Sequence, residues 1–161
     1  MISDAPPQYL IERTYRAVES EIGRSAGTAG ERPPFVVTFR VEQPAAGWLT
    51  TAVTRIEHLT ALAANWDSYG AQPVTAEAAV AAVRFLLNAA YPEIAAPAVV
   101  PLPDGGVQLE WHRGGLDIEI AFSEAEPGIY VEDHTTGTSH ESSLSDAAGQ
   151  LLQLAPRLRE A

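Results

Sequence analysis

The stretch that decides the fold is VQLEWHRGGLDIEIAF, residues 107–122. Apolar and polar residues alternate on both sides of Gly114-Gly115, and this period of two is typical of strands with one buried face. A glycine pair between two such runs predicts a two-residue hairpin turn. We therefore expect two antiparallel strands joined at Gly114 and Gly115.

This turn also predicts which residues face each other across the hairpin. The partners on one face are all apolar, so the register and the hydrophobic pattern agree. A turn shifted to Arg113-Gly114 would keep the same two faces. The expected apolar partners are Val107 with Phe122, Leu109 with Ile120, and Trp111 with Ile118.

The opposite face of the hairpin brings carboxylates together. The same register sets His112 against Asp117 and Glu110 against Glu119, whereas the shifted turn would set Glu110 against Asp117. Two carboxylates that face each other destabilise a sheet unless a proton, a cation or a basic partner relieves the repulsion. Glu110, His112, Asp117 and Glu119 are therefore candidate binding residues.

Downstream of the hairpin, the sequence predicts one more strand and one helix. IYVED, residues 129–133, is rich in residues that favour strands, and the chain to about Glu141 is polar and reads as a loop. Ser143, with Asp146 three positions later, resembles a capping box that opens a last helix. Pro156 is expected to end or kink this helix.

Two helices are predicted upstream of the hairpin. Apolar residues repeat at helical spacing from Leu49 to Trp66, and a second, alanine-rich helix runs from about Ala76 to Ala90. Thr75 is the expected N-cap of the second helix. That helix should stop before Tyr91-Pro92, because a residue that precedes proline disfavours helical geometry.

The first 47 residues differ in character from the rest of the chain. We expect a helix over residues 7–22, a flexible Gly- and Pro-containing connection over 23–34, and a strand over 35–41. Residues 48–161 form the expected core region. The length of 161 residues fits a single domain overall.

The predicted fold class is α+β, with a three- to four-stranded antiparallel meander and helices packed on one face. The strand at 35–41 would be the fourth strand. The expected core residues are Ile56, Leu59, Leu62, Trp66, Val80, Val83, Leu86, Leu87, Val107, Leu109, Trp111, Ile118, Ile120 and Phe122.

Two motifs carry a resemblance to known proteins. NWDSYGA at residues 65–71, followed by an alanine-rich helix, and PLPDGG at 101–106, leading into LEW at 109–111, resemble an uncharacterised group of small bacterial and mobile-element proteins. The resemblance covers roughly residues 55–122. It implies a shared domain but no activity, because none is known for that group.

The NWDSYGA motif has two interpretations. It is a suitable corner between two helices, with Trp66 anchored in the core, Asn65 or Gly70 in the left-handed conformation, and Asp67 or Ser68 bonded to free backbone N–H groups. The alternative is a loop whose polar groups bind a ligand, with Asp67 and Tyr69 as the candidate binding residues.

The sequence favours no catalytic residue, metal or cofactor. The absence of Cys removes thiol chemistry and Cys-based zinc sites. No HExxH motif is present, and PDGG at 103–106 precedes a strand and reads as a turn. His134 and His140 fall in the expected loop and are predicted to be solvated.

Negative charge is concentrated in one part of the chain. The net charge is −11, and residues 104–146 contain ten acidic residues and one Arg, so this segment carries −9. Such a surface disfavours direct binding to nucleic acid or to an anionic membrane. The first residues lack a secretory signal, and no apolar run is long enough to span a bilayer, so we expect a cytoplasmic protein.

These patterns favour a non-enzymatic interaction module, resembling an antitoxin, an immunity protein or an adaptor, that docks a basic protein partner on the acidic sheet face. One alternative is an enzyme, dependent on a small molecule or metal, whose site lies between the 65–71 loop and the polar sheet face. A second alternative is a nucleic-acid mimic. Homo-oligomerisation stays open.

Overall fold

The computed structural model describes residues 46–89, 91 and 93–159. The fold is α+β, as predicted. In chain order its elements are α1 (Leu49–Thr60), α2 (Ala76–Ala89), β1 (Ala98–Pro101), β2 (Val107–Arg113), β3 (Leu116–Phe122), β4 (Gly128–Asp133), β5 (Thr138–Ser142), α3 (Leu144–Leu154) and the 3-10 turn η1 (Ala155–Arg157).

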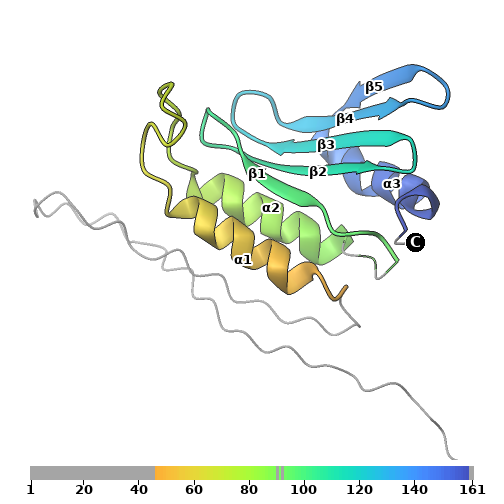
Figure 1. The fold of residues 1–161 in the computed structure, drawn as a ribbon, viewed down its shortest axis with the longest axis horizontal. Coiled ribbons are helices and arrows are strands. Elements are labelled where there is room, and N and C mark those ends of the chain that lie inside the picture. Colours follow the sequence, from red (N-terminus) through yellow and green to blue (C-terminus); the bar gives the residue numbers. More distant parts are fainter. Residues whose placement is uncertain (1–45, 90, 92, 160–161) are drawn as a thin grey trace, which may run out of the picture. The chain divides into compact units, whose positions relative to one another are not determined.

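The strands form one antiparallel meander in the order β1-β2-β3-β4-β5 (Figure 1). The described residues thus supply five strands, two more than the three predicted after residue 98. The expectation of a loop up to Glu141 is wrong, because residues 138–142 pair with β4. The helix expected at 7–22, the connection at 23–34 and the strand at 35–41 lie outside the described residues.

The register of the central hairpin is confirmed at every predicted pair. Gly114 and Gly115 have φ angles of 64° and 73°, as a tight two-residue turn requires. Arg113 pairs with Leu116, which excludes the turn shifted by one residue. The hairpin therefore separates its apolar and polar side chains as the sequence predicts.

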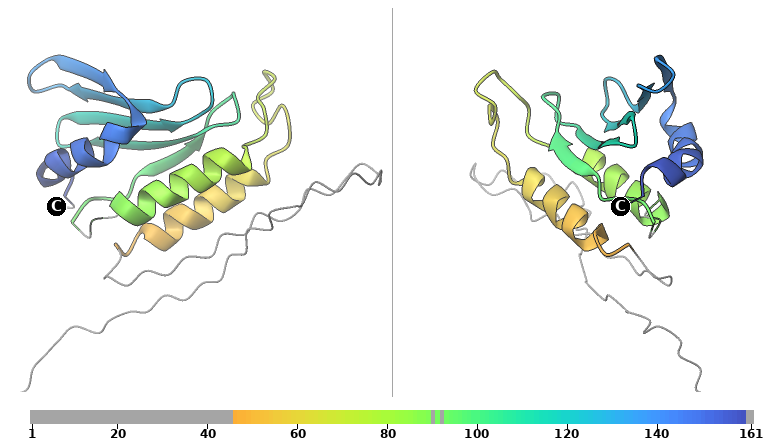
Figure 2. Two further views of the ribbon diagram at one scale, coloured as in Figure 1. Left: turned by 180° about the vertical axis from the view of Figure 1, so that it is seen from behind. Right: turned by 45° about the vertical axis from the view of Figure 1, so that its right-hand side comes forward.

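The three helices pack on the same side of the sheet (Figures 1 and 2). The apolar side chains of the strands are buried against them. Ten of the fourteen predicted core residues are buried. Leu62, Trp66, Val80 and Leu87 are only half-buried, so their assignment to the core is wrong. None of the described helices has the length and apolarity needed to cross a bilayer.

The first predicted helix ends earlier than its periodicity indicates. α1 stops at Thr60, and Asn65 adopts a φ of 63°, a left-handed conformation that a helix cannot include. Trp66 consequently lies outside the helix and does not continue its apolar face. Its Nε1 donates to the carbonyl of Gln72 at 3.1 Å. At the start of α2, Thr75 accepts the N–H of Ala78 at 3.1 Å, which confirms the predicted N-cap.

The start of α3 differs in detail from the predicted capping box. Ser143 immediately precedes the helix, as expected, but its hydroxyl donates to the carboxylate of Asp146 at 2.7 Å. It therefore caps no backbone N–H. The helix ends at Leu154, before Pro156, as predicted.

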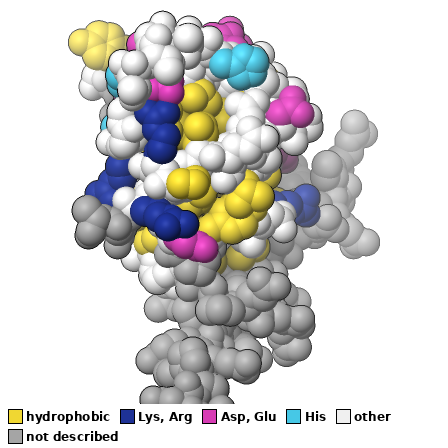
Figure 3. Space-filling view, turned by 90° about the vertical axis from the view of Figure 1, so that its right-hand side faces the viewer, with side chains coloured by type: hydrophobic (Ala, Val, Ile, Leu, Met, Phe, Trp, Pro, Cys, Tyr) yellow, Lys and Arg dark blue, Asp and Glu magenta, His cyan; other side chains and the backbone are white. Residues whose placement is uncertain are grey.

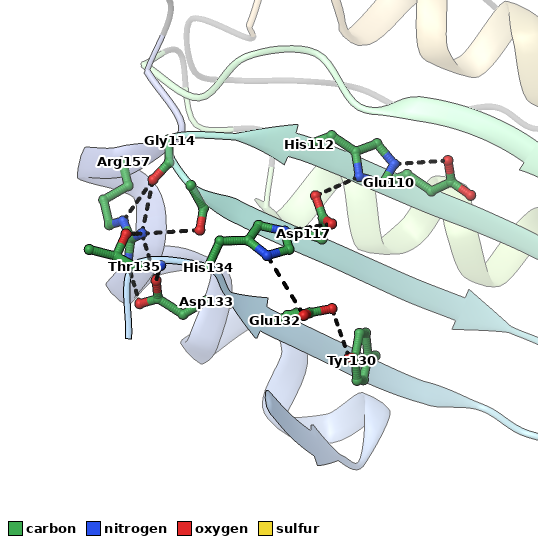
Figure 4. A network of polar contacts seen from close by, with 11 residues as sticks. Glu110, His112, Gly114, Asp117, Tyr130, Glu132, Asp133, His134, Thr135 and Arg157 are labelled. Carbon is green, nitrogen blue, oxygen red and sulfur yellow. Dashed lines mark hydrogen bonds and ion pairs between the residues drawn. The ribbon is translucent and has the colours of Figure 1, made fainter. Parts of the chain in front are cut away.

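Arg157 attaches the C-terminal segment to the central hairpin. Its guanidinium donates to the carboxylate of Asp133 at 2.6 and 3.0 Å and to the carbonyl of Gly114 at 2.9 and 3.1 Å (Figure 4). This paired contact holds the pKa of the Asp133 carboxyl well below its ordinary value of 3.8. The turn at the end of β2 and β3 is thereby fixed.

We expect Asp133→Asn to be less stable than the wild type at pH 7, with the difference shrinking as the pH falls below 3.8. A carboxyl whose pKa is lowered on folding stabilises the fold above its unfolded pKa, and this contribution is lost as the pH falls toward the folded pKa. Urea unfolding at pH 7 and pH 3 measures the change. Glu124→Gln, in the exposed loop after β3, is the control; an equal pH response in both variants would contradict the assignment.

Candidate functional site

The second face of the sheet, which we call the open face, carries the polar side chains of the strands. Figures 1 and 2 show the three helices on the opposite side. The open face carries five carboxylates, and none of the five described arginines projects from it, since Arg113 shares the face of Trp111. The carboxylates belong to Glu110, Asp117, Glu119, Glu132 and Glu141.

Four of these carboxylates form two cross-strand pairs. Glu110 lies opposite Glu119 in the β2–β3 ladder, as predicted, and Asp117 lies opposite Glu132 in the β3–β4 ladder. Directly opposed like charges destabilise a sheet. The open face therefore has a local excess of negative charge that a cationic group would relieve.

A row of polar contacts crosses three strands of this face (Figure 4). Asp117 is at its centre: one carboxylate oxygen accepts from His112 Nδ1 at 2.8 Å, and the other accepts from His134 Nε2 at 2.8 Å. The row continues on one side from His112 Nε2 to Glu110 at 3.4 Å. On the other side, His134 Nδ1 lies 3.7 Å from Glu132.

This row shifts the pKa values of its members in opposite directions. Hydrogen bonds from His112 and His134 lower the pKa of the Asp117 carboxyl, and the bond to Asp117 is the main reason why the pKa of each imidazole is raised. At the end of the row, desolvation and then the bond to Glu132 raise the pKa of Tyr130. Asp117 is thus held ionised between two imidazoles.

His134 is a member of the site that the sequence analysis missed. The prediction that it is solvated in a loop is confirmed, because His134 lies in the turn after β4 and half of its side chain is exposed, but its ring also contacts Asp117. Its backbone N–H donates to the carbonyl of Gly115, which continues the β3–β4 pairing beyond β4. The sequence pattern that could have identified His134 is its spacing of two residues from Glu132 and four from Tyr130, which places all three side chains on one face of a strand.

Three of these residues could together bind a metal ion. Asp117, Glu132 and His134 each offer one ligand atom, and the three atoms lie within 4.8 Å of one another. His112 and Glu110 flank this group without joining it. Glu119 lies beside this row of contacts, because it is opposite Glu110 in the β2–β3 ladder and opposite Tyr130 in the β3–β4 ladder.

The NWDSYGA loop is held by its own side chains. Asp67 Oδ1 accepts the backbone N–H groups of Tyr69 and Ala71 at 2.8 and 3.1 Å, and these bonds lower the pKa of the Asp67 carboxyl. Asn65 Oδ1 accepts the N–H of Gly70 at 2.7 Å. The expected backbone-binding role of Asp67 is confirmed, while Tyr69 is 94 % exposed.

The structure brings the two sequence motifs together. The N–H of Gln72 donates to the carbonyl of Pro103 at 2.7 Å, and the N–H of Thr75 donates to Gly105 at 2.9 Å. A Cβ at Gly105 would lie against the carbonyl of Pro73, so this contact leaves no room for a side chain. PLPDGG is thus a turn that supports the NWDSYGA loop.

Asp67 and Tyr69 are not brought together with the other candidate residues. Their loop contacts the turn that precedes Val107, whereas His112 is near the other end of β2. Strand residues advance by about 3.4 Å each, which puts roughly 17 Å between Val107 and His112. The 65–71 loop and the β2–β3 turn, beside which His112 lies, are therefore at opposite ends of the sheet (Figure 1).

Charge is distributed differently at the end of the molecule that lies to the right in Figure 1. Figure 3 shows arginine side chains beside apolar ones at the centre of this view, with the acidic side chains separated from one another around them. The carboxylates at this end are therefore not grouped as they are on the open face.

Comparison with known proteins gave no relative: no family model, no curated protein and no solved structure matches this chain. The resemblance to the bacterial and mobile-element group, based on residues 65–71 and 101–111, stays a prediction.

Proposed function

We propose that this chain is a non-enzymatic interaction module that binds a basic protein partner on the open face of its sheet. The observation that carries the proposal is the pairing of Glu110 with Glu119 and of Asp117 with Glu132 on a face from which no described arginine projects. Antitoxins, immunity proteins and assembly adaptors are the kinds of protein that such binding would suit. The cytoplasm is the location that the sequence favours.

Charge complementarity is the reason to expect a basic partner. An arginine- or lysine-rich segment laid across β2, β3 and β4 would place cations between opposed carboxylates and remove their mutual repulsion. The side chains of Glu110, Asp117 and Glu132 are 21 %, 33 % and 43 % exposed, so they are accessible yet partly held by neighbours. Held carboxylates lose less conformational entropy when a partner binds.

The two alternative functions have weaker support. An enzyme site shared by the 65–71 loop and the open face would need groups that lie at opposite ends of β2. A nucleic-acid mimic would need carboxylates spaced along an extended surface like phosphates, whereas the acids of the open face are grouped on adjacent strands. We retain the interaction module as the proposed function.

The proposal predicts where a basic probe binds. When an oligo-arginine peptide is titrated into the isotope-labelled protein at low salt, we expect amide NMR shifts to change mainly in β2, β3 and β4. The double variant Glu110→Arg with Glu119→Arg should weaken binding by at least about tenfold, since it reverses one of the opposed pairs. Binding should also weaken as salt screens the charges.

A matched control separates the open face from net charge. Glu57→Arg with Glu77→Arg makes the same change in total charge on α1 and α2, away from the open face. It should bind the peptide nearly as well as the wild type does. Equal loss in both double variants, or shift changes spread over the helices, would count against the proposal.

A further inference from the structure

We propose that Asp117, Glu132 and His134 form a binding site for a divalent transition-metal ion such as Zn²⁺. The site is at one end of the open face, on β3, on β4 and immediately after β4 (Figure 4). It does not depend on the binding of a basic partner. No ligand comes from the 65–71 loop, so it also differs from the enzyme site considered above.

The ligand atoms are close enough to share one ion. The three atoms lie within 4.8 Å of one another, and Asp117 Oδ2 is 2.8 Å from His134 Nε2. Atoms bound to one zinc ion at about 2.0–2.2 Å lie about 3–4 Å from one another. Small side-chain rotations would therefore bring all three to bonding distance, without a change in the backbone.

The types of ligand atom in this group determine which cations it would bind best. One imidazole nitrogen with two carboxylates suits Zn²⁺ and similar transition metals, whereas Ca²⁺ and Mg²⁺ prefer sites made of oxygen ligands alone. Three protein ligands on an exposed face leave at least one coordination position for water or for a group on another molecule.

Neighbouring side chains hold the ligands in position. His112 Nδ1 donates to the Oδ1 of Asp117 at 2.8 Å, and the Tyr130 hydroxyl donates to the Oε2 of Glu132 at 3.2 Å. The His134 ring lies between the two ligand carboxylates, with Nε2 2.8 Å from Asp117 and Nδ1 3.7 Å from Glu132. Such supporting contacts orient ligands and strengthen metal binding.

The sheet supplies an electrostatic reason for a cation at this place. Asp117 and Glu132 are directly opposed in the β3–β4 ladder, where two negative charges destabilise the pairing. A divalent ion between them would turn the repulsion into attraction. Glu110 and Glu119 are opposed in the same way, and His112 Nε2 lies 3.4 Å from Glu110, but among the described residues these groups do not form a set of three close ligand atoms.

The test is a titration of the whole chain with ZnCl₂ alone, followed by calorimetry and by amide NMR in a buffer that does not bind zinc. We expect one ion per chain and NMR changes centred on residues 117 and 132–134. His134→Ala should abolish this binding, and Glu132→Gln should weaken it at least about tenfold. His112→Ala, which removes only a supporting contact, should weaken it about tenfold.

His140→Ala is the matched control, because His140 is an exposed histidine on β5 outside the ligand set. It should bind zinc as the wild type does. Amide spectra of each variant without metal show whether the fold is retained. The proposal is overturned if the wild type binds no zinc, if His134→Ala binds as tightly as the wild type, or if His140→Ala loses as much affinity as His134→Ala.

Discussion

Trp111→Ala is expected to lower the free energy of unfolding by about 3–5 kcal/mol, the range found when a buried tryptophan is truncated. Trp111 is 2 % exposed and belongs to the apolar face of β2. Its Nε1 also donates to the carbonyl of Ala95 at 2.8 Å. The substitution would therefore leave a cavity and also an unpaired carbonyl.

The effect should extend beyond the cavity. Ala95 donates its own N–H to the carbonyl of Leu158 at 2.8 Å, and Ile94 pairs with Arg159. Trp111 thus holds the segment before β1 in contact with the C-terminal segment. Loss of Trp111 is expected to loosen both.

Chemical denaturation measures this prediction, with Trp66→Ala as the control. Trp66 is half-buried at the corner after α1, so its truncation should cost less than that of Trp111. Trp111→Phe should be intermediate, because it keeps an aromatic ring in the core but loses part of the indole volume and the N–H donor. A cost below about 1 kcal/mol for Trp111→Ala would show that β2 does not depend on this side chain.

Gly114→Ala is expected to destabilise the fold by about 2–5 kcal/mol. A φ of 64° costs a residue with a side chain about 1–2 kcal/mol. A Cβ at this position would also collide with the carbonyl oxygen of Arg157, and relieving such a collision costs about 1–3 kcal/mol more. The C-terminal segment would have to move away from the hairpin.

Gly137→Ala is a control with the same backbone strain and no collision. Gly137 has a φ of 68°, and nothing lies within 4 Å of where its Cβ would be. Denaturation should show a smaller loss for Gly137→Ala than for Gly114→Ala. Amide NMR should show changes at residues 155–159 in the Gly114 variant only, and equal losses in the two variants would mean that Arg157 is not held against the turn.

The central hairpin could be predicted from sequence because two independent signals agree on it. The glycine pair sets a two-residue turn, and the alternation on each side fixes which residues face the core. The alternation is also compatible with a turn shifted to Arg113-Gly114, which the pairing of Arg113 with Leu116 excludes in favour of the Gly114-Gly115 register. That register also placed Glu110, His112, Asp117 and Glu119 correctly on one face.

The rest of the site could not be predicted because its signals are weaker. The five residues between β3 and β4 do not fix a register as a two-residue turn does, so the partners of Asp117 on β4 stayed unknown. β5 has the sequence TSHES, which lacks apolar alternation; it pairs because β4 offers a free edge. These two pairings, of β3 with β4 and of β4 with β5, place Glu132, His134 and Glu141 on the open face.

The early end of α1 has a similar explanation. Helical spacing continues through Leu62 and Trp66, but the hydrogen bonds that Asn65 and Asp67 make within the loop compete with the helix. Asn and Asp side chains stabilise such turns strongly. Local side-chain bonding therefore overrides the periodicity of the apolar residues.

The strand order has a kinetic consequence. Within the described residues, every strand of the meander pairs only with its neighbours in the chain, so these pairings close no long loop. Folding rates rise as contacts become more local. We expect the Gly114-Gly115 hairpin to form first and the outer strands to be added in turn, faster than in sheets of similar size whose neighbouring strands are distant in sequence.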